Sequence, residues 1–162
     1  MSDVELRVVG PDDWALWRGI RLRALKDAPT AFGSTYESSV HLTEADFRDR
    51  LSGEAPSVLA LAGGDPVAMG GGFLHIEGWL HVVSMWVDPA WRGRGLGGRV
   101  LDLLVAWSGD RGLQVHLDVT VGNDAARAMY ERHGFAGTGE LEELRPGSAY
   151  QLERMVLADH LP

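Results

Sequence analysis

Residues 87–104, VDPAWRGRGLGGRVLDLL, contain a glycine-rich stretch in which a G-x-G-x-x-G spacing begins at Gly93. Amide groups of residues without side chains can converge on an anion, and the positive N-terminal end of a following helix strengthens the attraction. Arg92, Arg94 and Arg99 add full positive charges if their side chains turn inward. The stretch therefore predicts a phosphate-binding turn between a strand and a helix, and the alternative is a tight turn that binds nothing.

Three kinds of phosphate ligand suit such a turn. A nucleoside triphosphate loop ends in Gly-Lys-Ser or Gly-Lys-Thr, whereas this one ends in Gly98-Arg99-Val100, which excludes it. An NAD-binding Rossmann turn is favoured only by Asp118, about 20 residues downstream, where an acid for the ribose is expected. The spacer at 88–92 and the tight turns between the preceding strands count against it. Coenzyme A, with its pyrophosphate, is the third possibility.

Two segments resemble the GNAT superfamily of N-acetyltransferases. Residues 92–97, RGRGLG, are similar to its R/Q-x-x-G-x-G/A signature, and the Val-Asp-Pro at 87–89 is typical of the family. Residues 121–135, VGNDAARAMYERHGF, are similar to its second cofactor segment, N-x-x-A-x-x-x-Y-E-x-x-G-F. The stretch ALKDAPTAFGSTYE at 24–37 is similar to some bacterial members, so the resemblance covers nearly the whole chain.

The resemblance implies acetyl-CoA as the cofactor and assigns its contacts. In the family, the turn amides hold the pyrophosphate, and the strand before the turn pairs with the pantetheine arm through its backbone. An N–H of that strand can also stabilise negative charge on the acetyl oxygen. The contacts implied here are Met85, Trp86 and Val87 on the strand, Arg92, Gly93, Arg94, Gly95, Leu96, Gly97 and Gly98 in the turn, and Asn123 and Tyr130 downstream.

Catalytic roles are implied for Tyr130 and expected for a base. Tyr130 lies two helical turns after Asn123, so both share one face, although an N-cap and a half-buried aromatic are the plain alternatives. The resemblance implies that Tyr130 protonates the departing thiolate. The amine must lose a proton, and we prefer His81, or the neighbouring His75, as base because His81 alternates with Val83 and Met85 along the strand. The other chemically suitable groups are Glu37, Glu77, His116 and Asp118.

The amine substrate is expected to contact the segment between the first two helices. Phe32, Tyr36 and Glu37 form one wall of the expected site, and His75 lies near it. An aromatic and acidic wall suits a cationic amine. The function expected is direct attack of a primary amine, of a small molecule or a peptide, on acetyl-CoA in a ternary complex. A CoA-binding sensor that has lost turnover is the alternative.

Composition limits the other possibilities. The 162 residues include 21 glycines and no cysteine, which excludes disulfides, a cysteine nucleophile and thiolate metal ligands, and we expect no metal site. The net charge of −8 argues against nucleic acid as a partner. No apolar run is long enough for a membrane span, and the first residues lack an apolar signal core, so we expect a cytoplasmic protein.

Alternating and helical patterns predict the elements that position these residues. Together they indicate an α/β protein, a GNAT-like fold with a mostly antiparallel sheet, helices on both faces, and a single domain over residues 1–162. A homodimer through the C-terminal strands is possible in such a family. The expected strands are 4–9, 57–62, 67–76, 79–87, 113–121 and a closing hairpin at 139–157 through Arg145-Pro146-Gly147; the expected helices are 11–29, 43–51, 97–112 and 123–134.

Overall fold

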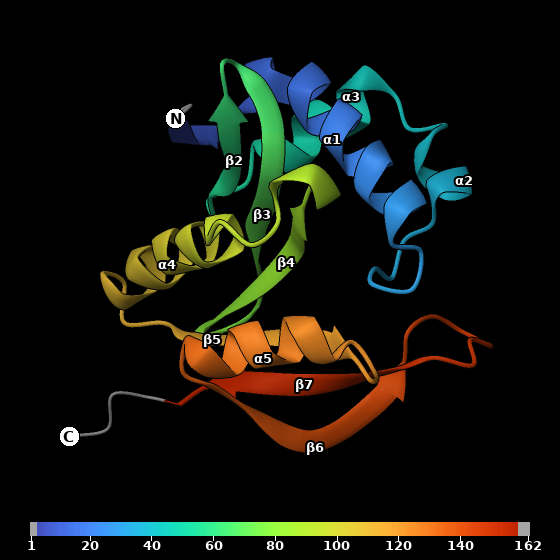
Figure 1. Ribbon diagram of the computed structural model, residues 1–162, viewed down its shortest axis with the longest axis vertical. Helices are drawn as coiled ribbons and strands as arrows, with labels where there is room; N and C mark the ends of the chain where they lie inside the picture. The colour runs from blue at the N-terminus through green and yellow to red at the C-terminus, as the bar shows by residue number, and fades with distance from the viewer. Residues whose placement is uncertain (1–2, 159–162) are drawn as a thin grey trace.

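The computed structural model describes residues 3–158 and contains a seven-stranded mixed sheet (Figure 1). The strands are β1 (Val4–Val9), β2 (Ser57–Ala62), β3 (Asp65–Ile76), β4 (Trp79–Val87), β5 (Gln114–Thr120), β6 (Phe135–Glu143) and β7 (Gln151–Leu157). The helices are α1 (Trp14–Asp27), α2 (Tyr36–Ser39), α3 (Glu44–Leu51), α4 (Leu96–Gly109) and α5 (Asp124–Arg132), with one-turn 3-10 helices at Pro11–Asp13 and Pro89–Trp91. The single domain expected over residues 1–162 includes ends outside this range and stays a prediction.

The strand order is β1-β2-β3-β4-β5-β7-β6, and every neighbouring pair is antiparallel except β4 and β5. This confirms the expected mostly antiparallel sheet. The NAD-binding alternative required a doubly wound parallel sheet and is wrong, because residues 3–158 contain one parallel pair. The strand β6 ends the sheet, so a dimer through the C-terminal strands stays a prediction.

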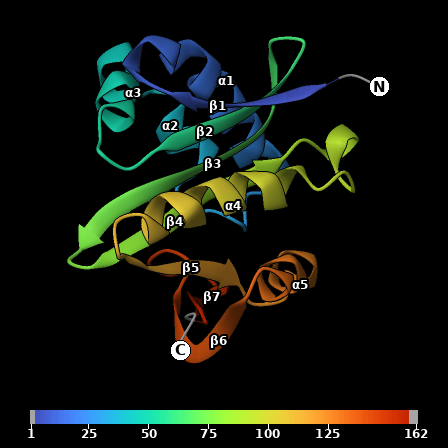
Figure 2. The ribbon, with the colours of Figure 1, turned by 90° about the vertical axis from the view of Figure 1, so that its left-hand side faces the viewer.

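The helices cover both faces of the sheet, as Figure 2 shows. Alternate residues of β2 point to opposite faces, so Leu59 packs against α1 and α3 while Val58 packs against α4. The helix α5 joins the α4 side, where Tyr130 is part of the core. Within the part of the chain described, no helix has the length and apolarity needed to cross a membrane.

The strands β4 and β5 separate after a short pairing. They pair only from Trp79 to His81 on β4, opposite Gln114 to His116 on β5. Farther along β4 the pairing with β3 slips, since Met69 faces Trp86 while Gly71 faces Val83. One extra residue on β4 makes this a β-bulge, and Ser84 there has a φ of 60°, which is rare outside glycine. A bulge bends its strand, and the space between β4 and β5 opens beside it.

Most expected elements are confirmed, with different ends. Thr43, the first residue of the expected helix 43–51, caps α3, since its hydroxyl accepts from the amide of Asp46 and the Asp46 carboxylate accepts from the amide of Thr43. Between the expected helices 11–29 and 43–51, the structure has the additional short helix α2, capped by Thr35. The strand β6 begins at Phe135, four residues before the expected hairpin, because its early residues pair with the end of β7.

Candidate active site

A cavity of about 320 Å³ lies where β4 and β5 separate. It joins parts of the chain that are far apart in sequence, since strands, a helix and a loop all contribute. Its lining comes from α1 (Arg21), the following loop (residues 31–34), β4 (residues 81–85), β5 (Leu117 and Asp118), α5 (Tyr130) and β7 (Leu152). The cavity therefore brings together His81, Phe32 and Tyr130, which the sequence assigned to one site.

The glycine-rich turn leads directly into α4. Gly93 and Gly95 have φ values of 80° and 76°, and no atom beyond their chain neighbours would lie within 4 Å of an added Cβ, so glycine is needed for backbone conformation. Gly95 is the N-cap of α4. No preceding helical turn offers carbonyls to the amides of Leu96, Gly97 and Gly98. These free N–H groups lie at the N-terminal end of α4, where the helix dipole is positive. This arrangement can bind an anion.

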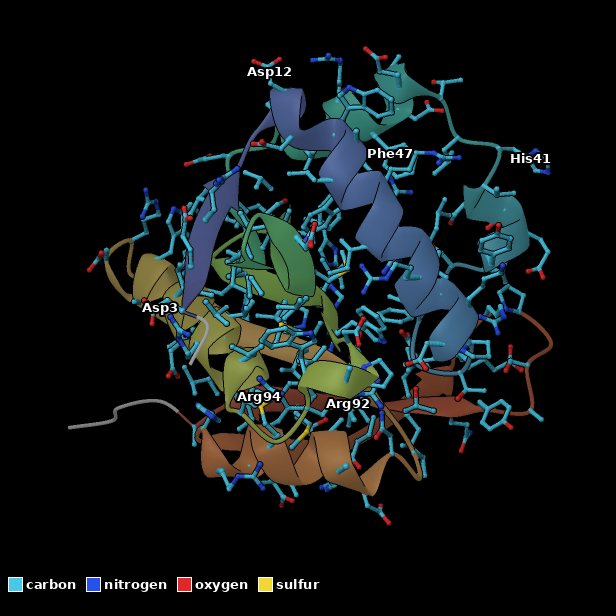
Figure 3. All side chains as sticks on the ribbon, turned by 45° about the horizontal axis from the view of Figure 1, so that its top comes forward. Asp3, Asp12, His41, Phe47, Arg92 and Arg94 are labelled. Carbon is cyan, nitrogen blue, oxygen red and sulfur yellow. The ribbon has the colours of Figure 1, made fainter. Side chains whose placement is uncertain are left out.

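The arginines of the turn contact the protein itself. Arg92 donates from Nη2 to Asp27 at 2.9 Å and from Nε to the Val87 carbonyl at 3.0 Å. The Arg94 guanidinium lies over the Trp91 ring at 4.4 Å, and both Arg92 and Arg94 are labelled in Figure 3. Arg99 donates to the carbonyl of Val4 at 3.2 Å. Arg92 is thus paired with a carboxylate, whereas Arg94 and Arg99 have no anionic partner among the described residues, so the turn amides and these two guanidinium groups are left to bind a pyrophosphate.

The three cofactor residues expected on β4 differ in burial. The Trp86 side chain is buried against α1, and its Nε1 donates to Asp27 at 3.0 Å. Met85 lines the cavity, and Val87 packs against the buried cluster that contains Leu96 of α4. Beyond His81 the β4 backbone has no pairing with β5, so its amides and carbonyls there are available to an extended ligand.

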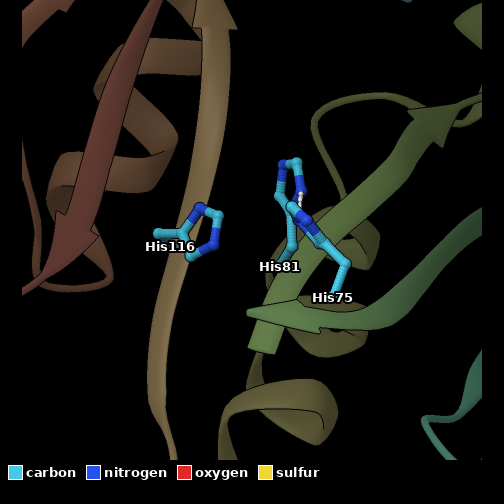
Figure 4. Close-up of side chains that lie close together, drawn as sticks. All are labelled: His75, His81 and His116. Atoms are coloured by element: carbon cyan, nitrogen blue, oxygen red, sulfur yellow. Dashed lines mark hydrogen bonds between the residues drawn. The ribbon is translucent and has the colours of Figure 1, made fainter. Parts of the chain in front are cut away.

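His81 is held between a carboxylate and a second imidazole. Its Nε2 lies 3.2 Å from Asp118, and its Nδ1 lies 2.9 Å from Nε2 of His75 (Figure 4). Burial would raise the pKa of Asp118, but hydrogen bonds and charges from His81 and Arg154 outweigh it and lower that pKa. Asp118 is therefore an anion at neutral pH. The proton of His81 then lies on Nε2, which leaves Nδ1 as the acceptor.

His116 lies against the same group. Its ring stacks on His81 with centroids 4.5 Å apart, it is 2% exposed, and neither of its nitrogens has a hydrogen-bond partner among the described residues. Burial, followed by the charges of His81 and Arg154, lowers the pKa of His116 to about 4, so the ring is neutral. Burial, then the charge of His81, lowers the pKa of His75 as well.

The three imidazoles are close enough to raise the question of a metal. One nitrogen from each of His75, His81 and His116 lies within 4.8 Å of the others. The rings of His81 and His116 are stacked at 23°, so their in-plane lone pairs lie in nearly parallel planes and do not converge on one point. This orientation suits a hydrogen-bonded group better than a metal centre, and a metal-free site stays our prediction.

Tyr130 faces the cavity from α5. It is 8% exposed, and its ring meets Phe135 edge-on at 6.1 Å. Burial raises the pKa of Tyr130 to about 12, so the phenol is protonated at neutral pH and can donate a hydrogen bond. Asn123 caps the same helix, since its Oδ1 accepts from the amide of Ala126 at 3.3 Å, and its side-chain NH₂ is then free to donate.

Of the expected substrate wall, Phe32 lines the cavity, whereas Tyr36 and Glu37 are not among its lining residues. Tyr36 is stacked by Lys26, whose ammonium lies 4.9 Å from the ring centre. His75 reaches the site through His81 and also lines a second cavity at the β3–β4 turn.

Arg21 lines the cavity as well, and sequence reasoning missed it. The signal was present, because Arg21 follows Trp17 by four residues and precedes Ala24 by three. A charged residue thus lies on the apolar face of α1.

Fold and site together define a class of protein. A sheet that opens between two strands, with an anion-binding turn at one end and a lined cavity at the other, can hold an extended anionic cofactor beside a second small molecule. Residues 22–135 match the model of the acetyltransferase (GNAT) family, and the chain belongs to this family.

Curated relatives match part of the chain. The N-alpha-acetyltransferase RimI of Mycobacterium tuberculosis is 45% identical over 58 residues, which are 36% of this chain and 35% of that protein. The uncharacterized protein ML0378 of Mycobacterium leprae is 38% identical over 78 residues, which are 46% of this chain and 21% of that protein. The matches thus span about a third and about a fifth of the lengths of these relatives.

Solved structures share the fold over almost the whole chain. An acetyltransferase of the GNAT family from Streptococcus pneumoniae has a TM-score of 0.79 at 19% identity and covers 95% of this chain and 98% of its own. The protein yncA of Salmonella typhimurium, solved with its cofactor acetyl-CoA, has a TM-score of 0.77 at 18% identity. The match covers 99% of this chain and 97% of yncA. At these identities the likeness supports the fold.

Proposed function

We propose that the protein transfers the acetyl group of acetyl-CoA to a primary amine by direct attack in a ternary complex. The observation that carries the proposal is the single cavity at the β4–β5 opening, which His81, Asp118 and Tyr130 all line. Acetyl-CoA supplies the acetyl group as a thioester. The amine nitrogen bonds to the acetyl carbon, the carbon–sulfur bond breaks, and the amine loses one proton.

The residues present suit this cofactor. The free amides at the start of α4 accommodate the pyrophosphate, and left-handed glycines at 93 and 95 bring the backbone close to it. The unpaired part of β4 can donate and accept backbone hydrogen bonds along the amide-containing arm. An N–H beside the bulge can donate to the acetyl oxygen as negative charge develops.

His81 is proposed as the base. Asp118 holds its Nε2–H, so Nδ1 is the nitrogen able to take a proton from the amine. His75 now donates to that nitrogen, and its position marks where the amine would approach. With no cysteine in the chain, a thioester on the enzyme is excluded.

Tyr130 is proposed to act on the leaving sulfur. A thiol has a pKa near 8.5, well below the value of about 12 for Tyr130, so complete proton transfer from the phenol is uphill. Tyr130 therefore stabilises the developing thiolate mainly by donating a hydrogen bond. Removing that donor is expected to slow the reaction while leaving the binding of acetyl-CoA intact.

The function is tested by measuring the release of free thiol from acetyl-CoA with a panel of amines: amino acids, polyamines, aminoglycosides and peptide N-termini. The mass of the acetylated product identifies the acceptor. We expect turnover with at least one amine and a fall in kcat of roughly tenfold or more in Tyr130→Phe, since one charge-assisted hydrogen bond is lost. A protein that binds acetyl-CoA but acetylates no amine would instead be the sensor alternative. Full activity in Tyr130→Phe would remove the role given to that residue.

A further inference from the structure

Arg21 is a buried cation without a partner. It is 7% exposed, and among residues 3–158 it is the one arginine, lysine, aspartate or glutamate that is buried. Its Nη1 has no hydrogen-bond partner among the described residues. Its guanidinium lies 4.8 Å from the centre of the Phe32 ring, a cation–π contact that holds the plane of the group but accepts no hydrogen bond.

Other arginines near this region have acidic partners. Arg154 donates to Asp118 at 3.3 Å, and Arg92 donates to Asp27 at 2.9 Å. For Arg21, burial and then the positive charge of Arg50 lower the pKa to about 10, and no carboxylate opposes them. The group stays charged at neutral pH. A buried charge left unpaired is strongly unfavourable, so an anion that enters the cavity would be bound strongly.

Arg21 lies in the same cavity as the proposed base. Arg21 and Phe32 line the same cavity as His81 and Asp118. One part of the cavity is thus lined by an arginine whose side chain donates no hydrogen bond among the described residues, and another part offers the proposed base beside an anion. A molecule that carries a carboxylate and an amine a few bonds apart matches both parts.

We propose that Arg21 binds a carboxylate of the acceptor, so that the substrate is a free amino acid or a similar small amino acid-like compound. The inference rests on the proposed function and names the substrate class of the same site. Arg21 presents donors in the fork that fits a carboxylate, and Phe32 fixes its plane. The cavity of about 320 Å³ is at the small end of ligand pockets, which suits such a compound.

This substrate differs from the one expected from the sequence. The expected aromatic and acidic wall of Phe32, Tyr36 and Glu37 favoured a cationic amine, but the charged helix residue that lines the cavity is Arg21. In a protein of net charge −8, the carboxylate of an amino acid needs a local positive charge to be bound. A peptide N-terminus has no carboxylate beside its amine, so peptides are expected to be poor acceptors.

Matched pairs of acceptors test the proposal, each an amino acid, its carboxamide and the amine that lacks the carboxyl group. We expect wild-type kcat/KM to be about ten- to a hundredfold higher for the carboxylate member, the range of a charge-assisted hydrogen bond. Arg21→Met should abolish this preference, mainly through KM, and leave the carboxamide unchanged. Arg21→Lys should restore part of it. Arg18→Met, one turn away on α1 and outside the cavity lining, is the matched control and should keep the preference.

Two further measurements separate the possible failures. Heats of binding of the carboxylates and carboxamides, taken with CoA present, give the same comparison without turnover. The unfolding midpoint of Arg21→Met should equal or exceed that of the wild type, because an unpaired buried charge is removed. Wild-type protein that binds and acetylates carboxamides as well as carboxylates would overturn the proposal and leave the proposed function intact. Carboxylate binding that needs Arg21, without acetylation of any amine, would retain the carboxylate site and overturn the proposed function.

Discussion

At the scale of single residues, both nitrogens of His81 have partners. Nε2 lies 3.2 Å from Asp118 and Nδ1 lies 2.9 Å from His75. Because the lowered pKa keeps Asp118 ionised, the carboxylate selects the His81 tautomer with its proton on Nε2. The acceptor nitrogen then faces the position held by His75, so the amine has to displace His75 to reach the base.

Substitution of the pair should separate the base from the residue that orients it. We expect His81→Gln to lower kcat by about 10²- to 10⁴-fold, the usual contribution of a general base. Asp118→Asn should lower kcat by a smaller factor, because the imidazole remains but its tautomer is no longer selected. The affinity for acetyl-CoA should not change in either variant. Full activity of His81→Gln in steady-state assays would place proton removal on another group.

Because of Tyr130, the free energy of unfolding is expected to depend on pH in the alkaline range. Its pKa is about 12 in the folded protein and near 10 in an unfolded chain, so the folded state holds the proton more tightly. This contribution to the free energy of unfolding is complete below pH 10 and is lost as pH rises from about 10 to 12. Arg21, whose pKa is lowered to about 10, has the opposite effect over this range in both proteins, so the test is the difference between them. In urea unfolding, wild type should lose more stability than Tyr130→Phe, and an equal change in both would mean that other groups, such as Tyr36, Tyr150 or Lys26, account for it.

At the scale of elements, the bulge on β4 depends on a glycine in the neighbouring strand. A Cβ on Gly70 would lie 2.5 Å from Sδ of Met85 and 2.6 Å from a methyl of Val100. The bulged segment and α4 thus both pack against the bare backbone of β3. We expect this close packing to help keep β4 bent away from β5, and so to help keep the cavity open.

Replacement of Gly70 should therefore affect both stability and site. We expect Gly70→Ala to lower the free energy of unfolding by about 1–3 kcal/mol, as overpacking does. Acetyl-CoA binding should weaken too, because Met85 would be displaced. Gly71→Ala is the control in the same strand, since its nearest atom would be 3.6 Å away. Denaturant unfolding and CoA titration measure both effects, and similar losses in the two variants would contradict this account of the bulge.

At the scale of the whole molecule, the sheet brings distant segments to one point. His75 lies on β3, His81 on β4 and His116 on β5, and the stacked rings lie at the last pairing of β4 with β5. Because His81 and His116 face each other with parallel planes, we expect catalysis by hydrogen-bonded imidazoles without a metal ion.

Treatment with a chelator checks this expectation. Acetyl transfer after dialysis against a chelator should equal that of untreated protein within error, and the purified protein should contain less than stoichiometric zinc by elemental analysis. Loss of activity that returns with added zinc would show that the three imidazoles rotate to bind metal. The control is His116→Phe, which should keep the stack and not alter the response to chelator.

Much of the framework could be predicted from local patterns. Alternating patterns predicted the strands, the pattern over residues 43–51 predicted the helix that the structure has as α3, and the spacing around Gly95 predicted the phosphate turn. These features depend on neighbours within a few residues, which a sequence displays directly. Tyr130 was assigned to the site through the family resemblance, and His81 through its alternation along the strand that the resemblance places beside the cofactor.

The partners of those residues could not be predicted. Asp118 was one of several candidate bases, and only the tertiary structure set it beside His81 and Arg154. Arg21 resembled an ordinary helix arginine until the loop carrying Phe32 closed over it. Sequence alone determined the elements, the turn and the family resemblance, because these follow from short-range spacing. The charge of the acceptor site was decided by tertiary structure, because burial and the pairing of ions depend on which distant segments meet.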